Sequence, residues 1–175
     1  MEGEEELRLI EPSADWEKEY KEMLEDWQRS GEKRVPFVLD MDARDFPRLI
    51  RELENSSRGI GLPSGFVEHS TYWLVRGSRI VGVVNLRHRL NEKLLRIGGH
   101  IGYGIRPGER RKGYATAILT MTLLKARERG IRQVLVTCDK DNTGSARTIQ
   151  KNGGVLESEA REGETRVQRY WIEVT

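Results

Sequence analysis

The sequence predicts a single α/β domain, residues 1–175, built on a mixed sheet. Strand-like and helix-like segments alternate almost from end to end, and no repeat, low-complexity tract or linker divides them. Three strand candidates follow one another between residues 70 and 105, as in antiparallel sheets. Residues 134–137 instead form a nearly all-apolar run, which is typical of a strand buried on both faces. A length of 175 residues suits one domain of this kind.

The first third of the chain predicts one short strand and two helices. Leu7–Ile10 has the pattern of a short strand. Apolar residues then recur at helical spacing between positions 16 and 27, which predicts an amphipathic helix that stops near Gly31. A second helix is expected after Asp45. Residues 55–65 are rich in Ser, Gly and Pro, so we expect a loop that is long enough to border a substrate.

The middle of the chain predicts a hairpin and a further strand. Ser70–Val75 and Arg79–Leu86 are the two strand candidates, and the short Arg-Gly-Ser turn between them joins them as a hairpin. Gly98–Ile105 is expected to form the next strand. The polar residues 87–96 are expected to connect it to the hairpin.

The last third predicts helix, strand, helix and a closing hairpin. The first helix covers Gly113–Arg129, with Gly130 placed for a left-handed cap. A buried strand over residues 134–137 and a short helix over residues 142–152 follow. Two final strands pair at the C-terminal end, and their open edges would allow two subunits to pair, so a homodimer is one expectation.

The charge balance and the cysteine content restrict the class of protein. Net charge is +2, from 30 basic and 28 acidic residues, which favours neither nucleic acid nor an anionic membrane as a partner. Cys138 is the single cysteine, so no intrachain disulfide can form. The acidic start of the chain is no secretory signal, and no apolar run approaches the roughly 20 residues of a membrane span. These features predict a cytoplasmic protein.

The most informative segment is Ile101–Ala115, where a strand passes through a Pro-Gly break into a helix. The first N–H groups of a helix lack internal partners, and the helix dipole adds partial positive charge, so this turn can hold a pyrophosphate. Gly113 lets the backbone approach a bulky ligand closely. The same turn carries a basic cluster: Arg106, Arg110, Arg111 and Lys112. The alternative is an ordinary strand-loop-helix connection with solvated arginines, and composition alone does not decide between the two.

The spacing Arg110-x-x-Gly113-x-Ala115 resembles the R/Q-x-x-G-x-G/A motif of the GNAT superfamily of N-acetyltransferases. The resemblance implies a mostly antiparallel, twisted sheet with helices on both faces. It also implies that loop amides hold the pyrophosphate of acetyl-CoA, the acyl donor. The cofactor-binding positions carried over in this loop are Arg110, Arg111, Lys112, Gly113, Tyr114 and Ala115. The segments Arg87–Glu92 and Gly98–Tyr103 are similar to one bacterial branch of the superfamily.

A second segment, Asn142-x-x-Ser145 followed by Lys-Asn-Gly at 151–153, resembles the family's next cofactor segment. The resemblance implies that Asn142 binds the pantetheine arm, whereas helix capping is the simpler role and the one we favour for Ser145. Many relatives carry a tyrosine four residues beyond this serine, as a general acid for the departing thiolate. Here that position is Ile149, so Tyr103 or Tyr114 would have to replace it.

The resemblance also implies a V-shaped gap at a bulged strand, where backbone amides polarise the thioester carbonyl. The matching strand end runs from Gly102 to Ile105, and its glycines suit a bulge or a close ligand approach. For the base we expect His100 first and His88 second, because histidine titrates near neutral pH. Glu68, Glu92 or attack without a dedicated base are the alternatives.

The sequence therefore predicts transfer of an acetyl group from acetyl-CoA to a primary amine of a small molecule, peptide or protein, by direct attack in a ternary complex. A CoA-binding sensor without catalysis and a transferase using another acyl-CoA stay open as alternatives. Cys138 lacks any protease-like signature, and the three histidines have no metal-site spacing. Neither nucleophilic cysteine chemistry nor a metal site is therefore expected.

Overall fold

The computed structural model describes residues 5–175. The strands are β1 (Leu7–Ile10), β2 (His69–Arg76), β3 (Arg79–Arg87), β4 (Ile101–Ile105), β5 (Gln133–Asp139), β6 (Val155–Glu162) and β7 (Thr165–Glu173). The α-helices are α1 (Glu17–Ser30), α2 (Phe46–Ser57), α3 (Glu92–Arg96), α4 (Tyr114–Glu128) and α5 (Thr143–Lys151), and the short 3₁₀ helices are η1 (Ala14–Trp16) and η2 (Phe37–Asp40). Helices and strands follow one another in the predicted order, with three additional short helices, α3, η1 and η2.

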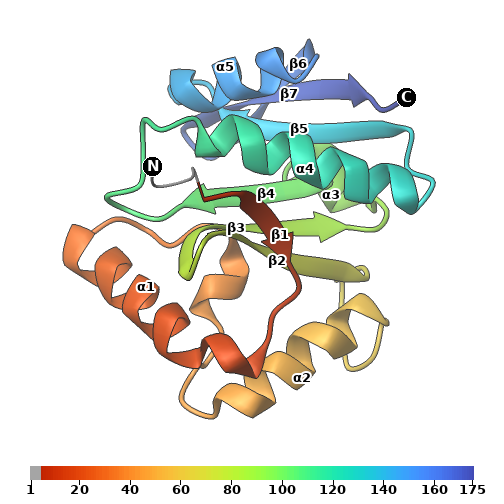
Figure 1. The fold of residues 1–175 in the computed structure, drawn as a ribbon. Coiled ribbons are helices and arrows are strands. Elements are labelled where there is room, and N and C mark those ends of the chain that lie inside the picture. Colours follow the sequence, from red (N-terminus) through yellow and green to blue (C-terminus); the bar gives the residue numbers. More distant parts are fainter. Residues whose placement is uncertain (1–4) are drawn as a thin grey trace.

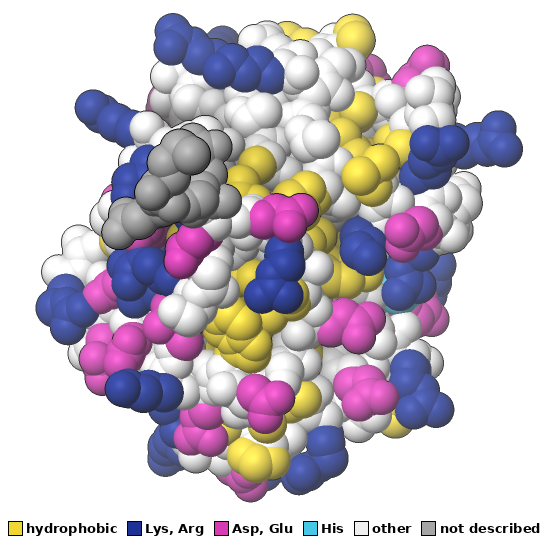
Figure 2. All heavy atoms as spheres, viewed as in Figure 1, with side chains coloured by type: hydrophobic (Ala, Val, Ile, Leu, Met, Phe, Trp, Pro, Cys, Tyr) yellow, Lys and Arg dark blue, Asp and Glu magenta, His cyan; other side chains and the backbone are white. Residues whose placement is uncertain are grey.

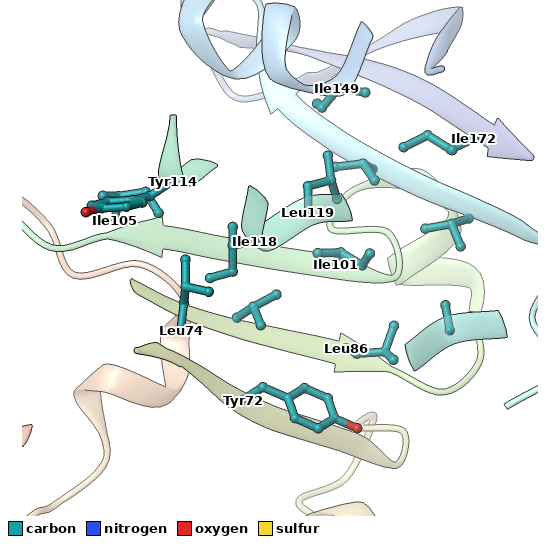
Figure 3. Close-up of a cluster of buried hydrophobic side chains, with 14 of the residues drawn as sticks. Tyr72, Leu74, Leu86, Ile101, Ile105, Tyr114, Ile118, Leu119, Ile149 and Ile172 are labelled. Atoms are coloured by element: carbon teal, nitrogen blue, oxygen red, sulfur yellow. The ribbon is translucent and has the colours of Figure 1, made fainter. Parts of the chain in front are cut away.

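The strands form two antiparallel sheets that lie side by side. Their orders are β1-β2-β3-β4 and β5-β7-β6. The two inner strands, β4 and β5, run in the same direction, and β5 rises away from β4 towards the Ile105 end (Figures 1 and 3). They meet near their starts, where Gly99 bridges Val136 and the His100 N–H donates to the Leu135 carbonyl at 2.8 Å. A gap therefore opens between the sheets at the carboxyl ends of β4 and β5.

Helices cover both faces of the strands, as predicted (Figure 1). Strand residues alternate between the faces, so β2 and β3 supply two separate cores. On one face Leu74 and Leu86 pack with α4 residues such as Ile118, whereas on the other Trp73 packs with α1 and α2. Basic and acidic side chains are interspersed on the face shown in Figure 2, which fits the small net charge.

Several boundaries differ from the sequence prediction. The helix α2 continues to Ser57, because the hydroxyl groups of Ser56 and Ser57 donate to carbonyls of the preceding turn. The strand β4 begins at Ile101, since Gly98 and Gly99 adopt positive φ of 109° and 64° and turn the chain. The short helix α3 was not predicted.

The buried side chain of Arg106 ties α1 to the loop that follows β4. Its exposed fraction is 2%, its Nε lies 2.6 Å from Asp26 Oδ2, and its Nη1 lies 2.7 Å from Glu19 Oε1. The same Nη1 donates to the Ile80 carbonyl at 3.1 Å. The prediction that Arg106 belongs to an exposed anion-binding cluster is therefore wrong, because its charge is already neutralised inside the fold.

Candidate functional site

The gap between β4 and β5 opens into a cleft of about 620 Å³. Four parts of the chain line it: the end of α1 with the segment after it, the end of β4, the loop into α4 with the first turn of that helix, and α5 with the residue before it. The lining residues are Trp27, Glu32, Lys33, Val35, Tyr103, Gly104, Ile105, Glu109, Arg110, Arg111, Gly113, Tyr114, Ala115, Thr116, Asn142, Gly144, Ser145 and Thr148. Most of the predicted cofactor-binding residues therefore lie around one cavity, and Lys112 is the exception.

The N-terminus of α4 faces this cleft without a cap. Gly113 occupies the capping position with φ 82°, no side chain bonds to the first turn, and Arg111 also has a positive φ, of 63°. The N–H groups from Arg111 to Thr116 have no acceptor among the described residues, and the first helical bond runs from Ala117 N to Gly113 O. A Cβ on Gly113 would meet no atom within 4 Å. The turn is thus an open row of donors at the positive end of a helix, which fits a pyrophosphate.

The basic side chains of this loop are mostly engaged by carboxylates. Arg110 pairs with Glu32 at 2.7 Å and lies over the Trp27 ring, and Lys112 pairs with Glu109 at 3.0 Å. Arg111 has no ion-pair partner in the described part of the chain and is exposed. An anion at this turn would therefore be attracted mainly by the backbone N–H groups and by Arg111. The other basic residues of the cluster contribute less than the sequence suggests, because carboxylates already pair with them.

The side chains of Tyr114 and Ile105 form part of the wall of the cleft and offer no free polar group to it. Both side chains are buried and lie together in Figure 3. The Tyr114 hydroxyl accepts a hydrogen bond from Arg76 Nη1 at 2.9 Å, so its polar end is held by β2. Tyr114 is for this reason a poor replacement for the missing proton donor.

Tyr103 and Ser145 meet across the gap. Tyr103 Oη lies 2.9 Å from Ser145 Oγ, which joins β4 to α5. Burial raises the pKa of Tyr103, so the phenol stays protonated at neutral pH and can donate a hydrogen bond. Ile149, at the position of the family tyrosine, is fully buried. The cleft thus carries a hydroxyl pair from Tyr103 and Ser145, whereas Ile149 offers it no polar group.

Asn142 caps α5 by accepting a hydrogen bond from the Ser145 N–H at 3.0 Å. The capping role that we expected for Ser145 therefore belongs to Asn142, and the Ser145 hydroxyl is directed to Tyr103. The Asn142 side-chain NH₂ group has no acceptor among the described residues and borders the cleft. Capping and ligand binding are compatible at this position, since they use different atoms.

The glycines of β4 serve close packing. The ladder between β3 and β4 keeps its register from Ile101 to Ile105, so the gap arises from the divergence of β5 and not from a shift in this ladder. A Cβ on Gly104 would overlap the carbonyl oxygen of Val35, and one on Gly102 would touch Pro36 and Arg87. The segment after α1 thus lies directly against the inner end of the cleft.

The sequence matches the family model described as an acetyltransferase (GNAT) domain over residues 6–155. The chain belongs to this family. It is therefore a GNAT acetyltransferase, and acetyl-CoA is the co-substrate that this membership implies. A comparison with curated protein sequences finds no match.

Solved structures share the fold of this GNAT acetyltransferase at low sequence identity. RimL, described as a ribosomal L7/L12 alpha-N-protein acetyltransferase in complex with coenzyme A, gives a TM-score of 0.72 at 15% identity, covering 96% of this chain and 94% of that one. The corresponding acetyl transferase from Salmonella typhimurium gives 0.69 at 15% identity, covering 97% and 95%. The microcin C7 self-immunity acetyltransferase MccE, with acetyl-CoA and AMP, gives 0.70 at 16% identity, covering 97% and 93%.

The two histidines predicted as bases lie away from the cleft lining of this acetyltransferase. His100 is buried, and its Nδ1 accepts a hydrogen bond from the Leu135 N–H at 2.9 Å. His88 Nε2 lies 2.7 Å from Ser70 Oγ, on the α4 side of β2. Burial lowers the pKa of each to about 4, helped by the charge of Arg87 for His100 and of Arg129 for His88. Glu68 and Glu92 are also absent from the lining.

The lowered pKa values predict a loss of stability in mild acid. Burial holds the pKa of His69 and His100 at about 4, below the ordinary 6.5, so both rings are neutral in the fold and charge more readily when unfolded. The two neutral rings contribute fully to the free energy of unfolding above pH 6.5. As the pH falls from 6.5 towards 4, that free energy decreases by at most about 1.4 kcal/mol per histidine and pH unit. Urea unfolding should give a lower free energy at pH 5 than at pH 7. His100→Asn, which can still accept from Leu135, should flatten that slope, whereas an unchanged slope would contradict the assignment.

Sequence reasoning missed one wall of the cleft. Trp27, Glu32, Lys33 and Val35, at the end of α1 and just after it, face the cofactor loop. The contacts depend on how α1 packs on the sheet, and no local pattern encodes that packing. The Gly-Glu-Lys-Arg sequence at 31–34 signals only a helix end.

Proposed function

We propose that this chain is an N-acetyltransferase that moves the acetyl group of acetyl-CoA to a primary amine, by direct attack within a ternary complex. The observation that carries the proposal is the uncapped start of α4. It places a row of free N–H groups in the same cleft as the Tyr103–Ser145 pair. The free N–H groups would bind a pyrophosphate at one end of this cleft, and the Tyr103–Ser145 pair would lie beside a thioester at the other end.

The residues of the cleft take separate roles in this proposal. The N–H groups from Arg111 to Thr116 bind the pyrophosphate, with Arg111 adding charge. The Asn142 NH₂ group hydrogen-bonds the pantetheine arm. Bound acetyl-CoA supplies an activated acyl group, and backbone N–H groups near Ile105 polarise its carbonyl. Tyr103 donates a hydrogen bond to the departing thiolate, and Ser145 holds the phenol in place.

No side chain of the cleft is assigned as a base. Histidines and the two candidate glutamates lie outside the lining, so we propose that the amine enters in its neutral form or loses its proton to water. Attack by a neutral amine on a thioester needs mainly positioning, which we assign to the walls of the cleft.

Tyr103→Phe should lower kcat for acetyl transfer by about 10- to 100-fold, because the thiolate loses its hydrogen-bond donor. Acetyl-CoA affinity should stay within about threefold, since the pyrophosphate contacts are unchanged. Tyr170→Phe is the matched control, because that hydroxyl bonds only to Gln168 among the described residues. Steady-state release of CoA thiol measures kcat. An equal kcat in both variants would contradict the role of Tyr103.

The activity itself is tested by mixing the protein with acetyl-CoA and a panel of primary amines, with thiol release and product mass as readouts. Acetylated amine together with free CoA thiol supports the proposal. Tight acetyl-CoA binding without transfer to any amine would favour a CoA-binding sensor, the alternative that the buried Ile149 suggests. Faster transfer from succinyl- or propionyl-CoA would reassign the acyl donor.

We also propose that residues 1–175 act as one cytoplasmic domain. In the described residues no helix is long and apolar enough to cross a membrane, and no group of metal-binding side chains is present. A homodimer stays a prediction, and the exposed Val155 and Leu156 on the outer strand β6 are where it would form. Light scattering at several concentrations measures the mass of the particle.

A further inference from the structure

A second group of polar side chains lies beside the inner end of the cleft, centred on Arg87. Burial lowers the pKa of Arg87 to about 10, and no acidic side chain contributes to that shift. Its Nη1 donates to the carbonyls of Gly98 and Gly99 at 3.2 and 3.5 Å, and its guanidinium lies 5.8 Å from the centre of the Phe37 ring. Nε and Nη2 have no acceptor in residues 5–175. Arg87 is half-buried, and a partly desolvated cation that lacks a carboxylate partner attracts an anionic ligand.

His69 adds a second donor to this group. Asn85 Nδ2 lies 2.8 Å from His69 Nδ1 and also faces the Ser70 carbonyl and Thr71 Oγ1, at 3.5 and 3.2 Å. Because the carbonyl can only accept, Nδ2 is the donor, and Nδ1 must accept from it. The neutral ring therefore carries its proton on Nε2, for which the described residues offer no acceptor. Arg87 and His69 thus present donors only, which is the pattern of an anion site.

Two exposed aromatic rings border these donors. Phe37 and Phe66 are 37% and 43% exposed, and their ring centres lie 5.8 Å apart. Phe37 also contacts His69, with ring centres 5.4 Å apart, and Phe66 lies 6.3 Å from the same ring. Exposed aromatic rings in contact with buried polar donors are characteristic of a ligand site rather than of an ordinary surface.

The position of this group points to the second substrate. A Cβ on Gly102 would lie 3.5 Å from Arg87 Nη1, so the guanidinium touches β4 one residue from Tyr103. Gly102 pairs with Asn85 in the ladder, and neighbouring residues of a strand face opposite sides, so Arg87 and Tyr103 lie on opposite faces of the sheet. Neither Arg87 nor the two phenylalanines line the cleft that we assign to acetyl-CoA.

We propose that Arg87, His69, Phe37 and Phe66 bind the acetyl acceptor and that this acceptor is a free amino acid with an apolar side chain. The carboxylate bonds to Arg87 Nη2 and His69 Nε2–H, and the apolar side chain packs on the two phenylalanines. The inference rests on the proposed function, because it names the amine class for the same reaction. Arg87 is here a specificity-determining residue.

The reaction balances without a further reagent. The neutral α-amine nitrogen attacks the acetyl carbonyl carbon, a C–N bond forms and the C–S bond breaks. The electron pair of the C–S bond leaves with the CoA thiolate, and the proton lost by nitrogen passes to solvent or to the thiolate. The products are an N-acetyl amino acid and free CoA.

The test compares matched acceptors that differ only in the carboxylate. L-Phenylalanine and phenethylamine form one pair, and L-leucine and 3-methylbutylamine the other, each assayed with saturating acetyl-CoA. We expect kcat/KM to be about 100-fold higher for the amino acids, because an amine without the carboxylate leaves the donors unpaired. Arg87→Gln should reduce that ratio to below about tenfold. Arg89→Gln, which removes a neighbouring arginine paired with Glu68 at 3.1 Å, should leave the ratio unchanged.

Binding without turnover gives a second readout. L-Phenylalanine titrated into the protein saturated with free CoA should release heat, and Arg87→Gln should abolish this binding while acetyl-CoA affinity is retained. Retained acetyl-CoA affinity also shows that the variant is folded, and Arg87→Lys, which keeps a charge, should recover part of the preference.

Four outcomes would overturn the inference while leaving acetyl transfer intact. The first is equal kcat/KM for both members of each acceptor pair, and the second is an equal loss of kcat/KM for both members in Arg87→Gln. The third is transfer only to peptides, in which an amide replaces the carboxylate of the N-terminal residue. The fourth is a preference for succinyl-CoA that depends on Arg87. No acetyl-CoA binding and no thiol release with any amine would instead overturn the proposed function.

Discussion

Arg106→Ala should lower the free energy of unfolding by about 3–5 kcal/mol, because it removes the cation that pairs with the partly buried Glu19 and leaves Asp26 with only the more exposed Arg29 and Arg79. Nε and Nη1 of Arg106 each bond a carboxylate, and Glu19 also accepts from the Ile80 N–H at 3.0 Å. Burial alone would raise the pKa of Asp26, but the hydrogen bonds and positive charges of Arg106 and Arg29 together outweigh it and hold that pKa below its usual value. The side chain therefore joins α1, β3 and the end of β4 in one network.

The control for Arg106 is an arginine in an exposed ion pair. Arg48 pairs with Glu52 one helical turn away at 3.0 Å, with 69% of its side chain exposed. Arg48→Ala should change the free energy of unfolding by less than about 0.5 kcal/mol, since exposed pairs contribute little. Urea denaturation measures both variants. Similar small losses in the two would show that the Arg106 network does not stabilise the fold.

Gly113→Glu should weaken acetyl-CoA binding by at least about 100-fold, because it places a carboxylate at the α4 N-terminus, where we propose that the pyrophosphate binds. A Cβ at this position would meet no atom within 4 Å, so we expect the effect to act on the ligand and not on packing. A non-glycine residue at φ 82° lowers the free energy of unfolding by about 1–2 kcal/mol. The control variant must therefore carry the same backbone strain.

Gly130→Glu supplies that control at the opposite end of the same helix. Gly130 has φ 78° and equally open surroundings, so the backbone strain and the added charge are matched. Calorimetric titration should give wild-type affinity for Gly130→Glu and no measurable binding for Gly113→Glu. Equal affinities in the two variants would exclude the α4 N-terminus as the pyrophosphate site.

The sequence was sufficient to predict features encoded by short-range patterns. Helical patterns predicted α1, α2, α4 and α5, and the left-handed conformation predicted for Gly130 at the end of α4 is confirmed by its φ of 78°. The short helix α3 lacks such a pattern over its five residues. Its one signal is Asn91, whose side chain accepts from the Leu94 N–H at 2.9 Å as an N-cap.

Contacts between distant segments could not be predicted from local patterns. Arg106 and Arg110 cannot be told apart from the local sequence. Arg106 is buried and pairs with α1 carboxylates 80 or more positions away, whereas Arg110 is exposed and pairs with Glu32. The Tyr103–Ser145 pair joins residues 42 positions apart. The tautomer of His69 likewise depends on Asn85, from a neighbouring strand.

The central claim is that acetyl-CoA binds in the cleft between β4 and β5, with its pyrophosphate on the start of α4. Amide hydrogen exchange with and without acetyl-CoA tests it most directly, because the N–H groups of residues 111–116 have no acceptor within residues 5–175. We expect acetyl-CoA to slow exchange at these amides and around residues 142–145. Unchanged exchange there at saturating acetyl-CoA, or protection confined to the separate pocket near Ser57 and Arg129, would contradict it.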